Sequence, residues 1–192
     1  MGWQSEEFGT SHEGRAAAVL PDGTEPGPRY FDTGSGPEVH TSRDWWVYDG
    51  TMGAPLAAGL RGACSCGWRG PSRHPLDWAR VTEDRPYLFD TSGPYEDWTR
   101  HVGEVESRSV PLPVALEVLL ERITEQLDAL ADDAPLAALK AVAALERTVR
   151  RVGGDAAHRT RADEVSWEEI GRALGLTEEE ARSRLLRYRL GR

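Results

Sequence analysis

The amino-acid sequence predicts an α+β fold, in which a small tryptophan-rich module of short strands precedes an all-helical region. Five of the seven tryptophans lie between residues 39 and 103, among many glycine, proline and aspartate turn signals. After position 113, apolar residues recur instead at helical spacing. Pro111-Leu112-Pro113 stands between these regions, and a residue that precedes proline is disfavoured in a helix. We therefore expect three segments: an arm at 1–38, a module at 39–110 and a helical domain at 111–192.

The composition excludes several classes of protein. The apolar fraction is 39% and the mean hydropathy is −0.53, so we expect modest cores. No apolar run is long enough to span a membrane, the N-terminus lacks the features of a signal peptide, and two cysteines make no disulfide framework. No nucleophile–base pair, phosphate loop or carboxylate pair stands out, so we do not expect an enzyme. These features predict a soluble cytoplasmic protein.

Charge is unevenly distributed along the chain. The net charge is −9, but residues 1–145 hold 12 basic and 23 acidic residues, whereas residues 146–192 hold 11 arginines and nine acids. From Ala181 onward there are five arginines and no acidic residue. A general coat for nucleic acid is therefore excluded, and attraction to phosphate is expected only at the C-terminal end.

The N-terminal segments contain short predicted elements. Residues 1–38 are rich in turn-forming and polar residues, and we expect this arm to be flexible or loosely packed. Tryptophan side chains bury much area, so they are expected to form the core of the module at 39–110. Acidic residues flank them, which argues against a stacking surface for single-stranded nucleic acid. The expected elements are strands at 16–20, 45–48 and 60–68 and short helices at 77–81 and 95–105.

Both cysteines lie in one tight motif, G-A-C-S-C-G-W-R-G, at Cys64 and Cys66. Two thiolates one residue apart can bind one metal, and a structural zinc site needs four cysteine or histidine ligands. We expect His101, on a predicted helix, as the third ligand and His40 as the fourth, with His74 as its alternative. Two other interpretations stay open. The cysteines could be reduced and unligated in a turn, or they could form a redox pair, although a disulfide across this spacing is strained.

The pattern C-S-C-G-W-R-G followed by W-x-x-H resembles the small zinc-ribbon-like modules of actinobacterial proteins. This resemblance covers about sixty residues. It implies a structural zinc ion, with all four coordination positions filled by protein side chains.

Leucines at helical spacing mark the start of the C-terminal region. Residues 113–132 place six leucine or isoleucine residues on one face, with acidic residues on the other. A second helix is predicted at 135–152, with a break or kink at Gly153-Gly154 and a shorter piece at 155–162. The apolar face of the first helix exceeds what one partner helix covers. The tryptophan module, a protein partner or a second copy of the chain could pack on residues 113–131.

Two short helices with a glycine turn between them are predicted at 166–190, which is the helix-turn-helix plan. Ser166 and Thr177 are N-cap candidates, and each has a glutamate three residues later. Gly175 is suited to the left-handed end of the first helix. Apolar residues suited to the core of this unit are Ile170, Ala173, Leu174, Leu176, Ala181, Leu185 and Tyr188.

The run W-E-E-I-G-R-A-L-G-L-T-x-x-x-A-x-x-R-L resembles the region-4-like helix-turn-helix of bacterial sigma factors and related actinobacterial regulators. In this motif the second helix enters the major groove of double-stranded DNA. The resemblance implies a DNA-binding transcriptional regulator or accessory factor. The residues that would contact DNA are Arg172, Thr177, Arg182, Ser183, Arg184, Arg187 and Arg189.

The start of the second helix favours an alternative. Three consecutive glutamates, at 178–180, place negative charge where a recognition helix approaches phosphate. In the alternative function, this unit docks on the transcription machinery or on another DNA-bound factor and does not read DNA itself.

Overall fold

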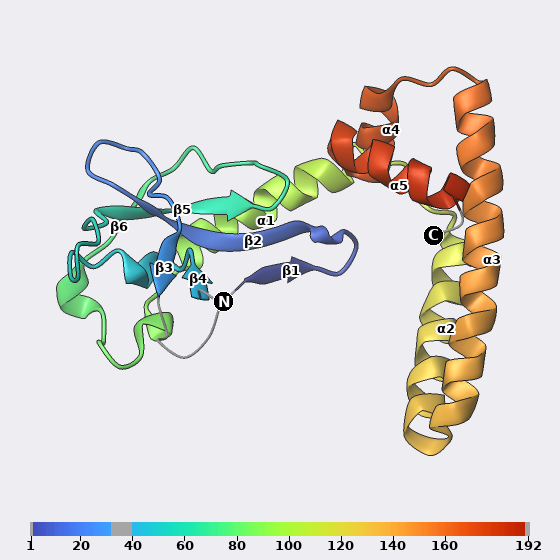
Figure 1. Ribbon diagram of the computed structural model, residues 1–192, viewed down its shortest axis with the longest axis horizontal. Coiled ribbons are helices and arrows are strands. Elements are labelled where there is room, and N and C mark those ends of the chain that lie inside the picture. The colour runs from blue at the N-terminus through green and yellow to red at the C-terminus, as the bar shows by residue number, and fades with distance from the viewer. Residues whose placement is uncertain (1, 32–39, 191–192) are drawn as a thin grey trace. The chain divides into compact units, whose positions relative to one another are not determined.

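The computed structural model describes residues 2–31 and 40–190, and the chain divides into two compact units, Met1–Ser107 and Arg108–Arg192 (Figure 1). The first unit combines short antiparallel strands with one long helix, and the second is entirely helical among its described residues. The predicted α+β fold is thus confirmed. The division falls three residues before the expected boundary at 110/111. The residues of the expected arm belong to the first unit.

The sheet of the first unit is antiparallel throughout, and its longest strand comes from the expected arm. The strands lie in the order β1 (Trp3–Ser5), β2 (Gly9–Val19), β5 (Gly59–Cys64) and β6 (His74–Pro75). β2 pairs with β5 from Gly14 opposite Cys64 to Val19 opposite Gly59. The expectation of a loosely packed arm is therefore wrong for residues 9–19, because Ala17, Ala18 and Val19 are buried in the centre of the sheet. Residues 32–38 of that arm lie outside the described residues.

A second, two-stranded sheet joins β3 (Arg29–Phe31) to β4 (His40–Ser42). Three single-turn 3-10 helices follow at intervals, η1 (Trp45–Val47), η2 (Trp78–Arg80) and η3 (Pro86–Leu88). The strand expected at 45–48 is wrong, since this segment is η1. Trp45 and Tyr48 are both buried, and a 3-10 turn stacks residues i and i+3 on one side, whereas a strand would point them to opposite faces.

The tryptophan core predicted for the first unit is present. Trp45 lies 5.9 Å from Trp78 and 5.4 Å from Phe89, measured between ring centroids, and it packs with Tyr48 and Leu60. Tilted and edge-on rings at these separations add attraction beyond the area they bury. The core therefore depends on a few large aromatic side chains beside small alanines of β2.

Helix α1 (Ser92–Glu106) packs on this sheet at close range. A Cβ atom at Gly14 of β2 would lie only 2.5 Å from the ring of Trp98, so only glycine permits this approach. His74 Nε2 also lies 2.9 Å from Asp97 Oδ2, which joins β6 to α1. These contacts hold α1 at the sheet and thereby set the position of His101 near its end.

The second unit begins with two long helices, α2 (Val114–Asp133) and α3 (Pro135–Ala162), which pack together as a hairpin. The break expected at Gly153-Gly154 is wrong, because α3 is continuous through it. A Cβ atom at Gly153 would lie 2.8 Å from the ring of Tyr188, so this glycine lets α5 approach α3 closely. Helices α4 (Trp167–Leu174) and α5 (Glu178–Leu190) complete the unit. Among the described residues, no helix has both the length and the apolarity needed to cross a bilayer.

Candidate metal centre and helix-turn-helix unit

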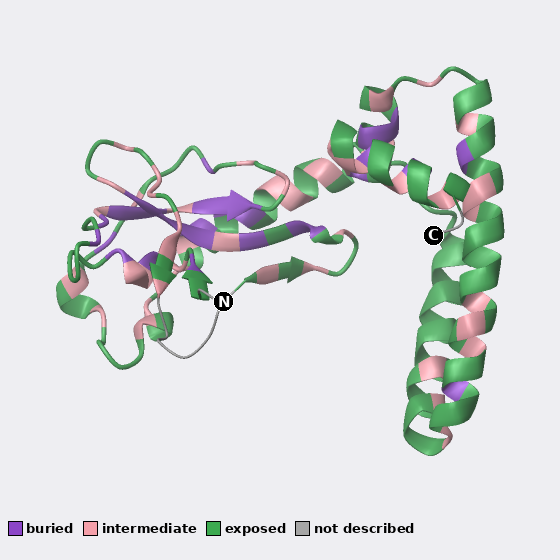
Figure 2. Cartoon of the chain, in the orientation of Figure 1, coloured by how far each residue is buried: buried purple, intermediate pink, exposed green. Residues whose placement is uncertain are grey.

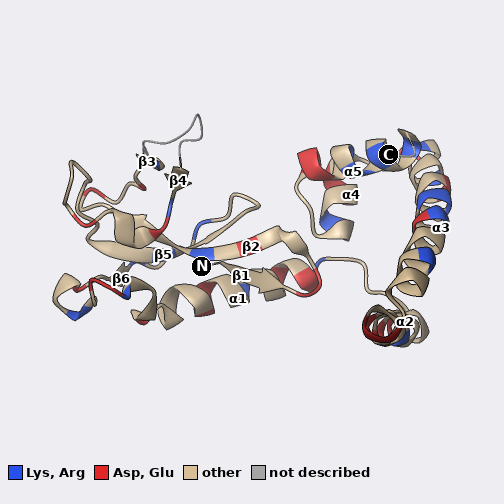
Figure 3. Cartoon of the chain, turned by 60° about the horizontal axis from the view of Figure 1, so that its bottom comes forward, with Lys and Arg blue, Asp and Glu red and all other residues tan. Residues whose placement is uncertain are grey.

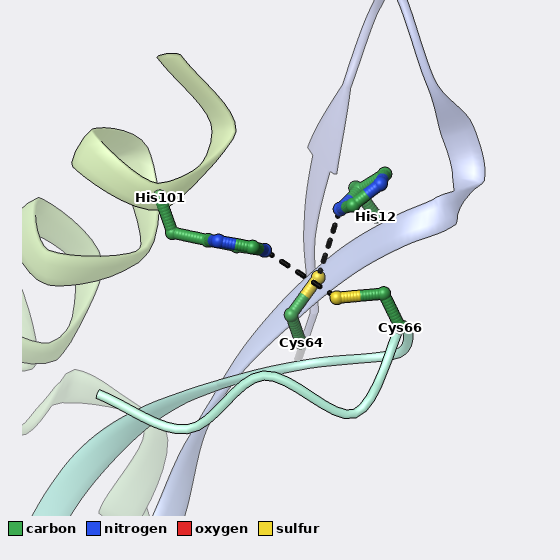
Figure 4. Close-up of side chains that lie close together, drawn as sticks. All are labelled: His12, Cys64, Cys66 and His101. Carbon is green, nitrogen blue, oxygen red and sulfur yellow. Dashed lines mark hydrogen bonds between the residues drawn. The ribbon is translucent and has the colours of Figure 1, made fainter. Parts of the chain in front are cut away.

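Four side chains converge in the first unit on a site that could hold a metal ion (Figure 4). They are His12, Cys64, Cys66 and His101, and their ligand atoms all lie within 4.8 Å of one another. The Sγ of Cys64 lies 3.5 Å from Nδ1 of His12, and the Sγ of Cys66 lies 3.4 Å from Nε2 of His101. The cluster therefore contains two imidazoles and two thiols from three different elements.

The strand pairing brings His12 beside the cysteine turn. His12 is in β2, and Cys64 ends the neighbouring strand β5. Ser65, between the two cysteines, donates its backbone N–H to the Glu13 carbonyl at 2.8 Å and accepts from the Glu13 N–H at 2.9 Å. Its hydroxyl also donates to the Thr10 carbonyl at 2.9 Å. Three hydrogen bonds thus fix the turn to the residues on either side of His12.

The turn itself is closed by glycine. Gly67 has a φ of +96° and donates its N–H to the Cys64 carbonyl at 3.1 Å. The Cys64 N–H in turn donates to the Trp68 carbonyl at 3.0 Å. A positive φ favours glycine, so the residue after Cys66 permits the chain to reverse and present both sulfur atoms on one side.

Aromatic rings enclose the cluster. The Trp68 indole stacks on the His101 imidazole with a centroid separation of 4.4 Å and an interplanar angle of 6°. Phe8 contacts His12 edge-on, with the centroids 5.1 Å apart. His12 and Cys64 are buried, each with 3% of its surface exposed. The rings fix the imidazole planes and limit access of water to the two buried members of the cluster.

The chemistry of the cluster suits a cation. Hydrogen bonding from Cys66, together with bonds from the His101 and His12 rings, lowers the pKa of Cys64 to about 2, although burial acts in the opposite direction. A cysteine binds metal as its thiolate. Zinc bonds of about 2.0–2.3 Å at tetrahedral angles separate ligand atoms by roughly 3.3–3.8 Å, and both sulfur–nitrogen distances fall in this range. All pairs of ligand atoms lie within 4.8 Å of one another, so the four side chains could hold a metal ion after a modest contraction of the cluster.

The structure brings together three of the four predicted ligands and replaces the fourth. His40 is an exposed residue of β4, opposite Phe31, and is not a member of the cluster. The alternative, His74, is hydrogen-bonded to Asp97, whose other oxygen accepts from Arg100 at 3.1 Å. The fourth member is His12, which precedes Cys64 by 52 residues.

The signal for His12 was weak because it depends on pairing between distant strands. His12 lies in a segment whose flanking composition favours turns, and it has no fixed spacing from the cysteine motif. A longer apolar strand continued from Ala16–Val19 back to Gly9 would have placed it opposite the cysteine turn. The residues from Ser11 to Gly14 are polar apart from glycine, and the adjacent Ser11 and His12 are both buried, so the segment shows neither the apolar run nor the alternation that would reveal that extension.

The helix-turn-helix unit contains two successive capping boxes. Ser166 Oγ accepts from the Glu169 N–H at 3.2 Å, and Glu169 Oε2 accepts from the Ser166 N–H at 3.1 Å. At α5, Thr177 Oγ1 accepts from the Glu180 N–H at 3.2 Å, and Glu180 Oε2 accepts from the Thr177 N–H at 2.9 Å. Gly175 ends α4 at φ +61° and ψ +37°, in the left-handed region. The local geometry expected for 166–190 is thus present.

A small core joins α4 and α5 to α3. Ala181 is fully buried, and Ile170 and Leu185 are 4% and 5% exposed. Ala157 of α3 is a member of the same cluster, and Tyr188 packs at its edge. Because α3 supplies part of this core, the unit is a three-helix arrangement and not a free pair of short helices.

The arginines of α5 flank its outward side. Successive residues of a helix advance by about 100°, so Ser183 lies opposite the core residues Ala181 and Leu185. The same spacing places the arginines on two flanks instead of one face. Arg184 and Arg187 lie on one flank, and Arg182 and Arg189 lie on the other.

Two of the candidate DNA-binding arginines are in ion pairs within their own helices. Arg172 lies 2.7 Å from Glu168, and Arg182 lies 2.8 Å from Glu178. The Arg182 guanidinium also lies 5.5 Å from the centroid of the Trp167 ring. Ser183, Arg187 and the end of α5 are exposed, whereas Thr177 is occupied as a cap.

Comparison of the chain with family models, with curated proteins and with solved structures finds no match.

Proposed function

We propose that this protein binds double-stranded DNA through its helix-turn-helix unit and that a zinc ion holds its N-terminal unit together. The observation that carries the DNA proposal is the pair of capped helices around a left-handed Gly175, with arginines on both flanks of the second helix. A helix in the major groove has a phosphate strand on each side. Arginines on two flanks suit that environment, and Ser183 lies on the side that would face the bases.

The glutamates at the start of α5 oppose this proposal less than their number suggests. Glu180 completes the cap of Thr177, and Glu178 is paired with Arg182. Both carboxylates also lie in the first turn, where the helix dipole favours negative charge. Glu179 is part of neither the Thr177 cap nor the Arg182 ion pair, and a carboxylate there can accept a hydrogen bond from a cytosine amino group.

Salt-dependent DNA binding is the test. Fluorescence anisotropy of labelled duplex DNA, measured over a series of salt concentrations, should give an affinity that falls as salt rises. Replacing Arg187 and Arg189 by Ala should weaken binding to all sequences and reduce the slope of log K against log salt by roughly 2. The matched control replaces Arg80 and Arg85, two exposed arginines of the acidic N-terminal unit, and should leave the slope unchanged. A wild-type protein that binds no duplex at low salt would refute the proposal.

The protein-docking alternative is supported by a separate observation. Leu186 and Leu190 of α5 are 53% and 59% exposed, and exposed leucines on a charged helix are typical of a protein contact. A folded protein that shows no salt-dependent DNA binding would favour this alternative. Leu186→Gln would then leave the fold intact and remove the docking contact.

The zinc proposal is supported by the donor set. Two cysteines and two histidines in tetrahedral reach are the usual ligands of structural zinc, and four protein ligands leave no open position for catalysis. Elemental analysis of purified protein should give one zinc per chain. His12→Ala should remove it, whereas His40→Ala, at an exposed histidine of β4 outside the cluster, should not. Retention of zinc by the His12 variant, or another metal at full occupancy in the wild type, would contradict the proposal.

A further inference from the structure

A cavity of about 400 Å³ lies in the first unit, at the end of the pairing between β2 and β5. Arg15, Arg43 and Arg69 are among its lining residues. Residues 1–107 hold 17 acidic residues and only nine arginines, and both kinds are spread over the unit (Figure 3). Three of the nine arginines therefore gather at one cavity, although their charges repel one another.

The strand register places two of these arginines on one face of the sheet. Arg15 of β2 lies opposite Ala63 of β5, and Ala63 in turn forms a bridge with Arg69. Residues directly opposite each other in neighbouring strands project from the same face. Both strands are mostly buried, and Ala63 is 1% exposed (Figure 2). The middle strand thus places only a methyl group between the two arginine side chains.

This face is the one turned away from the metal cluster. The Cβ position of Gly14 points at Trp98 of α1, and Cys64 is a member of the cluster. Arg15 follows Gly14 and Ala63 precedes Cys64, and successive residues of a strand point to opposite faces. The cavity is therefore a separate site, even though the turn at 64–67 forms part of its wall.

Arg43 brings the third guanidinium from the segment between β4 and η1. Its carbonyl accepts a hydrogen bond from Arg15 Nη1 at 3.2 Å, which ties this segment to β2. Burial lowers the pKa of Arg15, the charge of Glu25 opposes this effect, and the charges of Arg69 and Arg43 add to it. Three like charges are thus held close together in a partly desolvated place, where an anion would be stabilised.

The contacts of Arg69 leave part of its guanidinium available. Its Nε donates to Glu25 at 2.9 Å, and Glu25 is not among the residues that line the cavity. Its Nη1 donates to the carbonyls of Trp68 at 2.9 Å and Cys64 at 3.3 Å. These bonds fix the plane of the guanidinium, and none of them uses Nη2.

Two carboxylates also line the cavity, those of Glu13 and Asp44. Asp44 Oδ2 accepts from the Ser42 hydroxyl at 2.8 Å. Three cationic side chains thus face two anionic ones. An ionised carboxylate can only accept hydrogen bonds, so a ligand here needs an anionic group for the arginines and donors for the carboxylates.

We propose that this cavity binds a phosphate monoester of a small hydroxylated molecule. A phosphate monoester carries a charge of about −1.5 to −2 and three strong acceptor oxygens, which suit three guanidiniums better than a carboxylate does. Its hydroxyl groups supply the donors that Glu13 and Asp44 require. The volume of the cavity is in the range of small-molecule sites. The proposal rests on neither DNA binding nor metal binding.

Titration of the full chain with glycerol phosphate tests the site. In amide NMR spectra, the signals of Gly14, Arg15, Ser65 and Gly67 should shift and saturate, with a Kd of about 1 mM or tighter. Inorganic phosphate should shift the same signals but bind more weakly, because it lacks the hydroxylated carbon chain. Succinate, which offers only carboxylates, should bind most weakly of the three.

Arg43→Gln is the decisive variant. Arg43 is exposed, and among the described residues no hydrogen bond uses its side chain, so the fold should be unchanged. The variant should bind glycerol phosphate about tenfold more weakly, since it loses a charge-assisted hydrogen bond. Arg80→Gln is the matched control, at an exposed arginine of η2 outside the cavity, and should keep the wild-type affinity.

Four results would overturn the proposal. The first is the absence of saturable shifts at the four amides, or shifts that sodium chloride at the same ionic strength reproduces. The second is saturable shifts confined to the helix-turn-helix unit, which would place the anion there. The third is equal affinity of Arg43→Gln and Arg80→Gln. The fourth is tighter binding of succinate than of glycerol phosphate, which would exclude the phosphate ester as the preferred ligand.

Discussion

The contacts that stabilise each unit internally differ in sequence separation between the two units of this chain. In the N-terminal unit, His12 meets Cys64 across 52 residues and Cys66 meets His101 across 35. In the C-terminal unit, the caps that define α4 and α5 join residues only three apart. The first unit therefore depends on a few long-range ties, whereas the second is assembled from local geometry and then packed.

This difference implies different ways to fail. The metal ion proposed for the cluster would join β2, the cysteine turn and α1, and would close loops that are costly to close in the unfolded chain. Its loss removes several constraints at once. Among the described residues of the helical unit, no single contact links distant segments as the metal cluster does. Its stability is the sum of contributions from a small core, the helix caps and helix propensity. Four changes, from the largest expected effect to the smallest, test this contrast.

Metal removal should have the largest effect, and only on the N-terminal unit. Binding of structural zinc contributes about 10 kcal/mol or more in small zinc domains, so chelation with EDTA should unfold this unit. Six of the seven tryptophans lie there, and near-ultraviolet circular dichroism reports their packing. Helical dichroism at 222 nm should largely survive, because α2, α3, α4 and α5 belong to the other unit and only α1 belongs to this one. Simultaneous loss of both signals would show that the units are not independent.

Truncation in the helix-turn-helix core should come next. Leu185 is 5% exposed, and Leu185→Ala should reduce the free energy of unfolding of the C-terminal unit by about 2–4 kcal/mol. The neighbouring Leu186 is 53% exposed, so Leu186→Ala should change it by less than about 0.5 kcal/mol. Urea titration followed at 222 nm gives both values. Similar values for the two variants would contradict the assigned core.

Acid should weaken the N-terminal unit through Asp97. Its hydrogen bond from His74, and then that from Arg100, lowers the pKa of this carboxyl against the effect of burial. A folded pKa below the unfolded value, about 3.9, means that the stabilisation is complete well above pH 4 and is lost as pH falls through the folded pKa. Asp97→Asn should reduce stability at pH 7 by about 1.5–3 kcal/mol and flatten its fall below about pH 5. Thermal melts at pH 3 to 7 with zinc present throughout measure this, and parallel curves for wild type and variant would refute it.

Loss of a single cap should have the smallest effect. Ser166→Ala removes the acceptor for the Glu169 N–H and should cost about 1 kcal/mol in the C-terminal unit. Ser166→Asp keeps an acceptor and should be near neutral. Hydrogen exchange of the α4 amides detects the change even if the global melt does not. Equal protection in Ser166→Ala and wild type would show that the cap adds nothing.

The same contrast explains what could be predicted from the sequence. The caps at Ser166 and Thr177 and the turn at Gly175 were predicted because each depends on residues within one helical turn. Two cysteines and His101 were also found, since a C-x-C motif and a helical histidine are local signals. Zinc binding by the cluster and DNA binding by the helix-turn-helix unit both stay predictions.

The errors share one cause, which is that distant contacts overrode local pattern. His12 is the fourth member of the cluster because β2 pairs with β5, and the residues that flank His12 in the sequence do not predict this pairing. Trp45 and Tyr48 share one side of a turn because the core lies there, although their segment has strand propensity. Gly153-Gly154 lies within the continuous helix α3, and the close approach of Tyr188 to Gly153 is a contact with α5 that the local sequence does not reveal.

The flat stacking of Trp68 on His101 gives the cluster an optical reporter. An indole held 4.4 Å from a ligand ring lies within the field of any cation bound there, and that cation is the largest local charge. Filling the site should therefore shift the emission of this one fluorophore more than that of the tryptophans in the aromatic core. In Trp68→Phe, which keeps the six other tryptophans and an aromatic ring beside His101, the change in fluorescence on metal binding should therefore be largely lost.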